Sequence, residues 1–223
     1  MIFGSAKNED ESIVAMLAAA LRKDIAFGTL RPDQKLKLNE LRARYGGSNH
    51  SMRETLRILS SEGLVEATSQ RGFRVASATE NDLRDIAFVR VEIEKLALGL
   101  ALDADDVAWE GRVIAAHHAL QKAEQTVSQT SDDVTALEWD EACRAFSAAI
   151  VEGSGSPRLI EMQRRLFDQS RRFRLAHLRE GQLNFAARMA RQSALLDAIL
   201  GRDRDTALKV LQDDIRADLW AEP

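Results

Sequence analysis

Hydrophobic residues recur at every third or fourth position over most of the chain, which is the period of amphipathic helices. The first run covers residues 11–27, and its apolar positions are spaced by four: Ile13, Leu17, Leu21 and Ile25. Gly28 is placed to end this helix. Residues 38–45 repeat the pattern over a shorter length before the Gly46-Gly47 pair. Two helices separated by a turn are therefore predicted at the start of the chain.

A third helix is predicted to begin near Ser48 and to end at Gly63. Ser48 is a good N-cap, because its hydroxyl can accept from an otherwise unpaired amide. A Ser51-x-x-Glu54 capping box one turn later is the alternative start. With either start, one face is apolar and the opposite face carries two arginines. The apolar residues are Met52, Leu56 and Leu59, and the arginines are Arg53 and Arg57.

After this helix, two short apolar runs flank a polar segment. Leu64-Val65 and residues 73–75 enclose Ser69–Gly72, which predicts a β-hairpin in which Gly72 supplies backbone freedom. Two short helices, a tight turn and a hairpin predict a winged helix-turn-helix. In such a fold the third helix can enter a DNA major groove, where Arg53 can donate two hydrogen bonds to guanine. The alternative is that Arg53 and Arg57 are only a solvated helix face.

Beyond residue 80 the pattern stays helical and shows no strand-like alternation. Apolar stripes predict helices over 86–100, 107–120, 137–151, from 159 onwards, 182–200 and 203–219. One stripe per helix is typical of an antiparallel bundle, here of six or seven helices. The predicted fold class is mainly α. Residues 1–76 are expected to form a DNA-binding domain, and residues 77–223 a helical effector-binding and dimerisation domain.

The charge distribution changes near the same boundary. Residues 12–77 carry 11 Lys or Arg and 6 Asp or Glu, whereas residues 78–223 carry 19 and 26, in a chain of net charge −4. A basic N-terminal third suggests a polyanion-binding module. Cys143 is the single cysteine, which is typical of a reducing cytoplasm. No apolar run reaches the roughly 18 residues of a membrane span, so a cytoplasmic location without membrane contact is expected.

The segment LNELRARYGGSNHSMRETLRILSSEGLV (38–65), followed by RGFRV (71–75), resembles the GntR family of bacterial transcription regulators. The resemblance implies that Arg53 is the main base contact, that Ser48 contacts a phosphate and that Arg71-Gly72 contact DNA through the wing. The complete set of expected DNA contacts is Asn39, Ser48, Asn49, His50, Arg53, Arg57, Arg71 and Gly72. Asn49 stands where the family usually has a basic residue, so we expect a different operator base pair at that point.

The C-terminal helices resemble the FCD ligand-sensing domain of FadR-type GntR regulators, for example in residues 82–94, 146–159 and 195–207. In such domains an Asp, a His four residues on and two later histidines bind a divalent metal. Residues at i and i+4 share one helix face, which suits a metal site. The matching positions here are Cys143, Ser147, Gln192 and Asp214. Since all four ligands differ, we expect neither a metal nor another cofactor.

A metal-free pocket for an anionic effector needs another cation. Arg90 on the first helix of this domain is the candidate, because a guanidinium matches a carboxylate bidentately. The alternative is a surface pair with Glu94 at i,i+4. The expected effector contacts are Arg90, Cys143, Ser147, Gln192 and Asp214. A second basic cluster is interpreted as a solvated face: Arg171, Arg172, Arg174 and His177.

Together these features predict a homodimeric repressor that binds a palindromic operator in double-stranded DNA and responds to a small organic acid. A constitutive regulator with a decayed effector pocket is the alternative, because all four ligand positions have changed. An enzyme with an appended DNA-binding head is disfavoured. The sequence has no phosphate-binding glycine loop, no nucleophile beside a base and no metal-ligand set.

Overall fold

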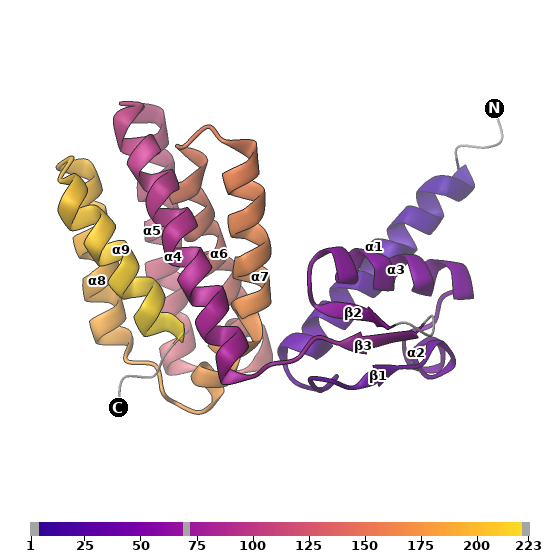
Figure 1. The fold of residues 1–223 in the computed structure, drawn as a ribbon. Helices are drawn as coiled ribbons and strands as arrows, with labels where there is room; N and C mark the ends of the chain where they lie inside the picture. The colour runs from indigo at the N-terminus through magenta and orange to yellow at the C-terminus, as the bar shows by residue number, and fades with distance from the viewer. Residues whose placement is uncertain (1–4, 69–71, 220–223) are drawn as a thin grey trace. The chain divides into compact units, whose positions relative to one another are not determined.

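The computed structural model describes residues 5–68 and 72–219, and the side chains of residues 12–68 and 72–219. The chain forms two compact units, Met1–Thr79 and Glu80–Pro223 (Figure 1). Among the described residues, no helix combines the length and the hydropathy that a bilayer crossing requires.

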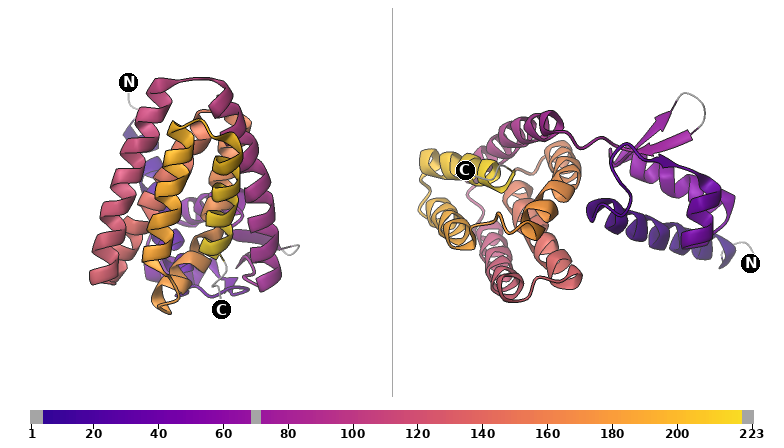
Figure 2. Two further views of the ribbon diagram at one scale, coloured as in Figure 1. Left: turned by 90° about the vertical axis from the view of Figure 1, so that its left-hand side faces the viewer. Right: turned by 90° about the horizontal axis from the view of Figure 1, so that it is seen from below.

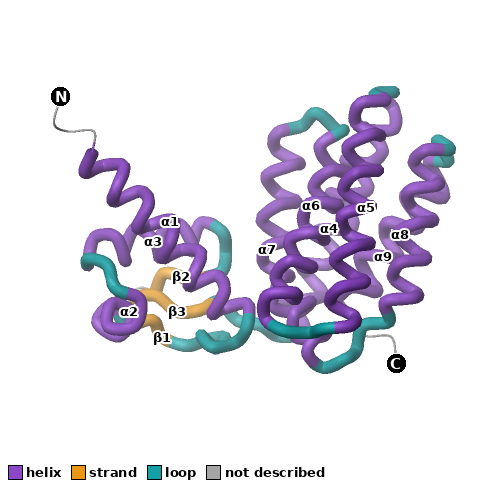
Figure 3. Tube along the Cα trace, turned by 180° about the vertical axis from the view of Figure 1, so that it is seen from behind, coloured by secondary structure: helices purple, strands orange, loops and turns teal. Residues whose placement is uncertain are grey.

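The first unit combines three helices with a small antiparallel sheet. The helices are α1 (Ser5–Ala26), α2 (Leu38–Tyr45) and α3 (Asn49–Ser61). The strands are β1 (Lys35–Leu36), β2 (Val65–Thr68) and β3 (Gly72–Val75), arranged in the order β1-β3-β2. Figure 3 shows these strands beside the helices of the same unit. This is the predicted winged helix-turn-helix.

Helix α3 is held by its apolar face. Met52, Leu56 and Leu59 are fully buried and pack with Leu17 and Leu21 of α1 in one core. This confirms the predicted buried face of the third helix. Burying three large side chains contributes several kcal/mol. The orientation of α3 about its own axis is therefore fixed, and with it the face that α3 presents to solvent.

Strand β1 was not predicted from the sequence. Lys35 pairs with Arg74 and Leu36 with Phe73, which adds a third strand to the hairpin. Two residues are too few to show an alternating pattern, so only the pairing with β3 defines this strand. The predicted hairpin tip at residues 69–71 lies outside the described residues.

The second unit is a bundle of six helices among the described residues, as the predicted fold class requires. They are α4 (Glu80–Asp103), α5 (Val107–Gln129), α6 (Asp133–Glu152), α7 (Pro157–Arg179), α8 (Phe185–Leu200) and α9 (Arg204–Leu219). Each helix packs on the next in the order α4, α7, α6, α5, α8 and α9, and α9 returns to α4. Figure 2 shows this ring end-on, with α6 also packed against α4. The interior of the ring is the natural place for a pocket.

Helix α8 begins three residues later than the pattern predicted. The side chain of Asn184 accepts a hydrogen bond from the backbone N–H of Ala187 at 3.0 Å and so caps α8. Asn is a favoured N-cap residue, and residues 182–184 are not helical. The start of α8 matters because Arg188 lies in its first turn.

Candidate functional site

The turn between α2 and α3 is built from two glycines in left-handed conformations. Gly46 has φ 81° and Gly47 has φ 80°. A Cβ on Gly47 would lie 2.9 Å from Cδ1 of Leu17. Only glycine combines this backbone with so close an approach to α1. The turn therefore fixes how α3 follows α2.

Helix α3 begins with a reciprocal cap. The Ser48 hydroxyl accepts from the backbone N–H of Ser51 at 3.0 Å, and the Ser51 hydroxyl accepts from the backbone N–H of Ser48 at 2.9 Å. Of the two predicted starts, the structure has the one at Ser48. Ser48 itself is exposed at the positive end of the helix dipole. Such an end is suited to a phosphate group.

The exposed face of α3 carries polar side chains at helical spacing. Asn49, His50, Arg53 and Arg57 are all exposed. Arg57 pairs with Glu54 at 3.2 Å, whereas Arg53 makes no side-chain interaction with the described residues. Arg53 therefore has a whole guanidinium available to an incoming partner.

Two further positions support this face from α2. Asn39 is exposed near the start of α2. Arg42 donates to the backbone carbonyl of Gly47 at 3.2 Å and to the Asn49 side chain at 3.3 Å. These bonds orient Asn49 next to the turn, and Arg42 was not among the predicted contacts.

The structure tests the predictions for the two wing residues, Arg71 and Gly72, to different extents. Arg71 lies outside the described residues. Gly72 begins β3 opposite Thr68 and does not adopt a left-handed conformation, so the predicted backbone freedom is wrong. Instead, a Cβ on Gly72 would lie 2.8 Å from the Thr68 hydroxyl. Glycine here provides space between the strands.

A small cavity lies within the helical bundle, among α4, α5, α6, α7, α8 and α9. Its charged and polar lining consists of Arg90, Glu94, Cys143, Ser147, Arg188, Asp214 and Asp218. The remaining lining is apolar. The volume is about 20 Å³, which is room for about one water molecule. Four of the five predicted effector contacts meet here, and Gln192 lies outside the lining.

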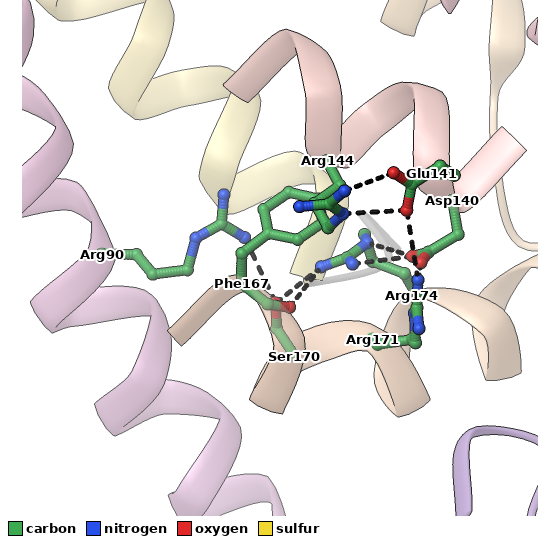
Figure 4. Close-up of polar contacts among 8 residues, drawn as sticks. All are labelled: Arg90, Asp140, Glu141, Arg144, Phe167, Ser170, Arg171 and Arg174. Atoms are coloured by element: carbon green, nitrogen blue, oxygen red, sulfur yellow. Dashed lines mark hydrogen bonds and ion pairs between the residues drawn. The ribbon is translucent and has the colours of Figure 1, made fainter. Parts of the chain in front are cut away.

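Arg90 is buried, with 2% of its surface exposed. Its Nε donates to Glu94 at 2.8 Å and its Nη1 to the Ser170 hydroxyl at 3.3 Å (Figure 4). Its Nη2 has no hydrogen-bond partner among the described residues. The pair with Glu94 exists, but the alternative of a surface pair is wrong because both side chains are buried.

The interpretation of Arg174 as part of a solvated face is also wrong. Arg174 is fully buried and donates to Asp140 at 2.7 Å and to the Ser170 hydroxyl at 2.6 Å. The guanidinium groups of Arg90 and Arg174 lie 4.8 and 3.8 Å from the Phe167 ring centre (Figure 4). Burial lowers the pKa of Arg174, against the opposing effect of Asp140. An arginine pKa is far above neutrality, so the group stays charged.

A second buried cation, Arg188, lies on α8. Its Nε donates to Glu124 at 2.6 Å, its Nη2 donates to the Cys143 sulfur at 3.3 Å, and it forms an ion pair with Asp218. Burial raises the pKa of the Cys143 thiol to about 12, against the opposing charge of Arg188. Cys143 is therefore a protonated thiol at neutral pH.

The side chains at the four family metal positions do not fit a divalent metal. Ser147 donates to Glu94 at 2.9 Å and accepts from Gln163 at 2.6 Å. The Gln192 amide donates to Glu124 at 3.2 Å, and Asp214 accepts from Arg191 at 3.3 Å. A protonated thiol, a hydroxyl and an amide are poor ligands beside one carboxylate. In the part of the chain that the structure describes, no three His, Cys, Asp or Glu side chains converge for a metal.

Sequence reasoning missed Arg188, Glu124 and Asp218. A buried charge cannot be distinguished from an exposed one by residue type alone. One signal was available, since Arg188 lies four residues before Gln192 and so shares a helix face with a predicted pocket position. Glu124 and Asp218 carried no such signal.

Family models match nearly all of the described chain. Residues 13–75 match the model described as "Bacterial regulatory proteins, gntR family", and residues 85–217 match the "FCD domain". The chain is 34% identical over 198 residues to the HTH-type transcriptional repressor GlaR of Escherichia coli K12, covering 87% of this chain and 89% of GlaR. It is 29% identical over 212 residues to the uncharacterised regulator BphR of Paraburkholderia xenovorans LB400, covering 93% and 84%.

Solved structures share the fold at lower identity. E. coli McbR/YncC matches with a TM-score of 0.70 and 22% identity, covering 92% of this chain and 94% of McbR. A GntR transcriptional regulator structure from Rhodococcus sp. RHA1 matches with a TM-score of 0.69 and 21% identity, covering 93% and 96%. These likenesses show the fold.

Proposed function

The chain belongs to the gntR family of bacterial regulatory proteins, in the FadR-type subgroup with an FCD domain, and on this premise we propose that it is a repressor released from DNA by a small carboxylate without a metal. As a member of this family it is a DNA-binding transcription regulator and not an enzyme. Repression is supported by the likeness to GlaR, which is named a repressor.

At the DNA, α3 enters the major groove with Arg53 as its main base contact. The exposed guanidinium of Arg53 supports this role: it makes no side-chain interaction with the described residues, and a bidentate contact to guanine needs two free N–H donors on one of its edges. Ser48 and the amino end of α3 bind a phosphate, with Asn39, Asn49, His50 and Arg57 beside them. Arg71 and Gly72 contact DNA from the wing; for Arg71 this rests on the sequence.

The protein acts as a homodimer on a palindromic operator. Two recognition helices related by a two-fold axis meet two half-sites, and the dimer doubles the number of phosphate contacts. An effector then acts by favouring one arrangement of the two DNA-binding units over another, and its influence equals its difference in affinity for the two.

The observation that carries the effector assignment is the cavity with two buried arginines. Arg90 and Arg188 line the same cavity, and the Nη2 of Arg90 has no hydrogen-bond partner among the described residues. In a site of low dielectric constant, such a guanidinium binds a carboxylate more strongly than it does in water. The metal positions hold side chains already engaged in hydrogen bonds, so the charge for the effector comes from arginine.

The test measures operator binding by fluorescence anisotropy, using DNA from the promoter beside the protein's own gene and chelator-treated protein. We expect small mono- or dicarboxylates to weaken operator binding at least about tenfold, a coupling of about 1.4 kcal/mol. Arg90→Ala is expected to remove the response while leaving operator binding in place. If no carboxylate changes the affinity, the constitutive regulator with a decayed pocket replaces this proposal.

A further inference from the structure

Arg188 is enclosed by groups that bear or accept negative charge. Glu124, Cys143 and Asp218 each contact a different nitrogen of its guanidinium. Although burial alone lowers it, the pKa of Arg188 is raised on balance by Cys143, Asp214 and Glu124. Burying a charge this deeply is costly unless its surroundings compensate it. The bundle is therefore built to keep one positive charge at this point.

The same surroundings include the family's metal-ligand positions. Cys143 contacts Arg188 directly, Asp214 interacts with it electrostatically, and Gln192 shares the Glu124 carboxylate with it. Three of the four positions are thus linked to one guanidinium: Cys143 by a hydrogen bond, Asp214 by its charge and Gln192 through a shared carboxylate.

The two acidic partners of Arg188 lie on different sides of it. Glu124 is fully buried on α5 and lies outside the cavity lining, so it is behind the guanidinium. Asp218 on the last turn of α9 lines the cavity and retains 8% exposure. Burial raises the pKa of Glu124, against the opposing charge of Arg188. Of the two acids, Asp218 is the one that a ligand in the cavity meets.

We propose that Arg188 supplies, in place of a divalent metal, the positive charge that holds the effector carboxylate, and that Asp218 occupies this position until the effector replaces it. The inference rests on the proposed function and identifies the side chain that binds the effector carboxylate. The cavity has room for about one water molecule, so a carboxylate enters only by displacing something. Exchange of Asp218 for the effector carboxylate keeps the number of buried charges constant and returns the Asp218 side chain to water.

The exchange of Asp218 for an effector carboxylate also alters the packing of helix α9. Asp218 is held between Ile215 and Leu219, which pack their side chains into the bundle. When Asp218 leaves Arg188, the last turn of α9 loses an ion pair with α8. The effector thereby changes the packing of α9 against its neighbours, which is the kind of difference that a population shift requires.

The test measures carboxylate binding directly by isothermal titration calorimetry with chelator-treated full-length protein, using propionate and succinate as probes. In Asp218→Asn the competing internal carboxylate is gone, and we expect both probes to bind about tenfold tighter than in the wild type. Asp213→Asn, which removes the same charge from the exposed side of α9, is the matched control and is expected to behave like the wild type.

Variants of Arg188 test the cation itself. Arg188→Met is expected to abolish probe binding, and Arg188→Lys, which keeps the charge but not the fork of donors, to weaken it about tenfold. Circular dichroism reports whether each variant folds, and if Arg188→Met does not fold, Asp218→Asn and Arg188→Lys decide the question. Zn²⁺ added to the wild type is expected to leave probe affinity unchanged.

Four results would overturn the inference: unchanged or weaker probe binding in Asp218→Asn, full probe binding in Arg188→Met, binding that requires Zn²⁺, or absence of probe binding in both the wild type and Asp218→Asn. Because the measurement contains no DNA, a failure of operator binding cannot imitate any of these results. If the probes bind with the same affinity in the Arg188 and Asp218 variants as in the wild type, the protein still binds carboxylates, but Arg188 and Asp218 have no role in that binding.

Discussion

Pairing and burial distinguish the arginines proposed to contact DNA from those proposed to bind the effector more clearly than position in the sequence does. Arg53 is exposed and has no ion-pair partner among the described residues, Arg57 is exposed and paired, and Arg90 and Arg188 are buried and paired. An exposed ion pair contributes little, whereas a buried charge is expensive unless it has partners. The free guanidinium is therefore available for recognition outside the molecule, and the buried ones for recognition within it.

For Arg53 this argument gives a direct prediction. Arg53→Ala is expected to remove about 1–3 kcal/mol of discrimination between the operator and a half-site with one changed base pair. Competition binding with the two DNA sequences measures the difference. Arg164→Ala, which removes an exposed charge from α7, is the control for the change in net charge. Equal discrimination in Arg53→Ala and the wild type would exclude Arg53 as a base contact.

Cys143 provides a prediction about pH. Its pKa is raised to about 12 by burial, whereas an exposed thiol titrates near 8.5. At neutral pH the native thiolate is then roughly three-thousandfold scarcer than in the unfolded chain, and its labelling rate keeps rising with pH beyond the range of an ordinary thiol. Alkylation by iodoacetamide followed by mass spectrometry measures this, and guanidinium-unfolded protein is the control. Since Cys143 is the single cysteine, rapid labelling of native protein would contradict the assignment.

At the scale of elements, the sequence predicts a feature best where that feature depends on local residue spacing or on the chemistry of one residue. The apolar face of α3 follows from spacing by three and four, and the Ser48 cap from the chemistry of serine. Strand β1 was missed because it exists only through pairing with β3. The pocket was predicted in part: Arg90, Cys143, Ser147 and Asp214 line one cavity, yet Glu124 and Asp218 were missed because burial of a charge depends on tertiary packing.

The α2–α3 turn gives a prediction at this scale. Gly47→Ala places a Cβ 2.9 Å from Leu17 and forces alanine into φ 80°. Gly46→Ala has a similar φ of 81° but no atom within 4 Å of its Cβ. Both variants are expected to lose about 1–2 kcal/mol from the left-handed conformation, and Gly47→Ala about 1 kcal/mol more from the clash. Urea unfolding measures the loss of stability in both variants. Equal losses would show that Leu17 of α1 moves aside for the extra methyl group without a cost in stability.

At the scale of the whole molecule, the proposed palindromic operator calls for two copies of the chain, and we propose that the helical unit joins them. Helix α4 offers a surface for this on its solvent side. Phe88, Leu96 and Leu100 are 65%, 56% and 42% exposed, and they lie on an exposed stripe that recurs every fourth residue with Glu92 between them. Large apolar side chains gathered on one helix face are typical of an interaction surface. A two-fold axis would place the same stripe of a second copy of the chain against this one, so that both sets of apolar side chains are buried.

We therefore expect Leu96→Glu to convert the proposed dimer to a monomer. A buried carboxylate opposite its own copy, close to Glu92 of both chains, adds repulsion and desolvation to the loss of apolar contact. Sedimentation equilibrium measures the mass, and Met162→Glu, at a residue 48% exposed on α7, is the matched control. The monomer is expected to keep its helical content and to lose cooperative binding to the full operator while still binding a half-site weakly. A Leu96→Glu protein that remains dimeric would move the interface to another face of the bundle, because a symmetric contact through α4 brings the two copies of this carboxylate together.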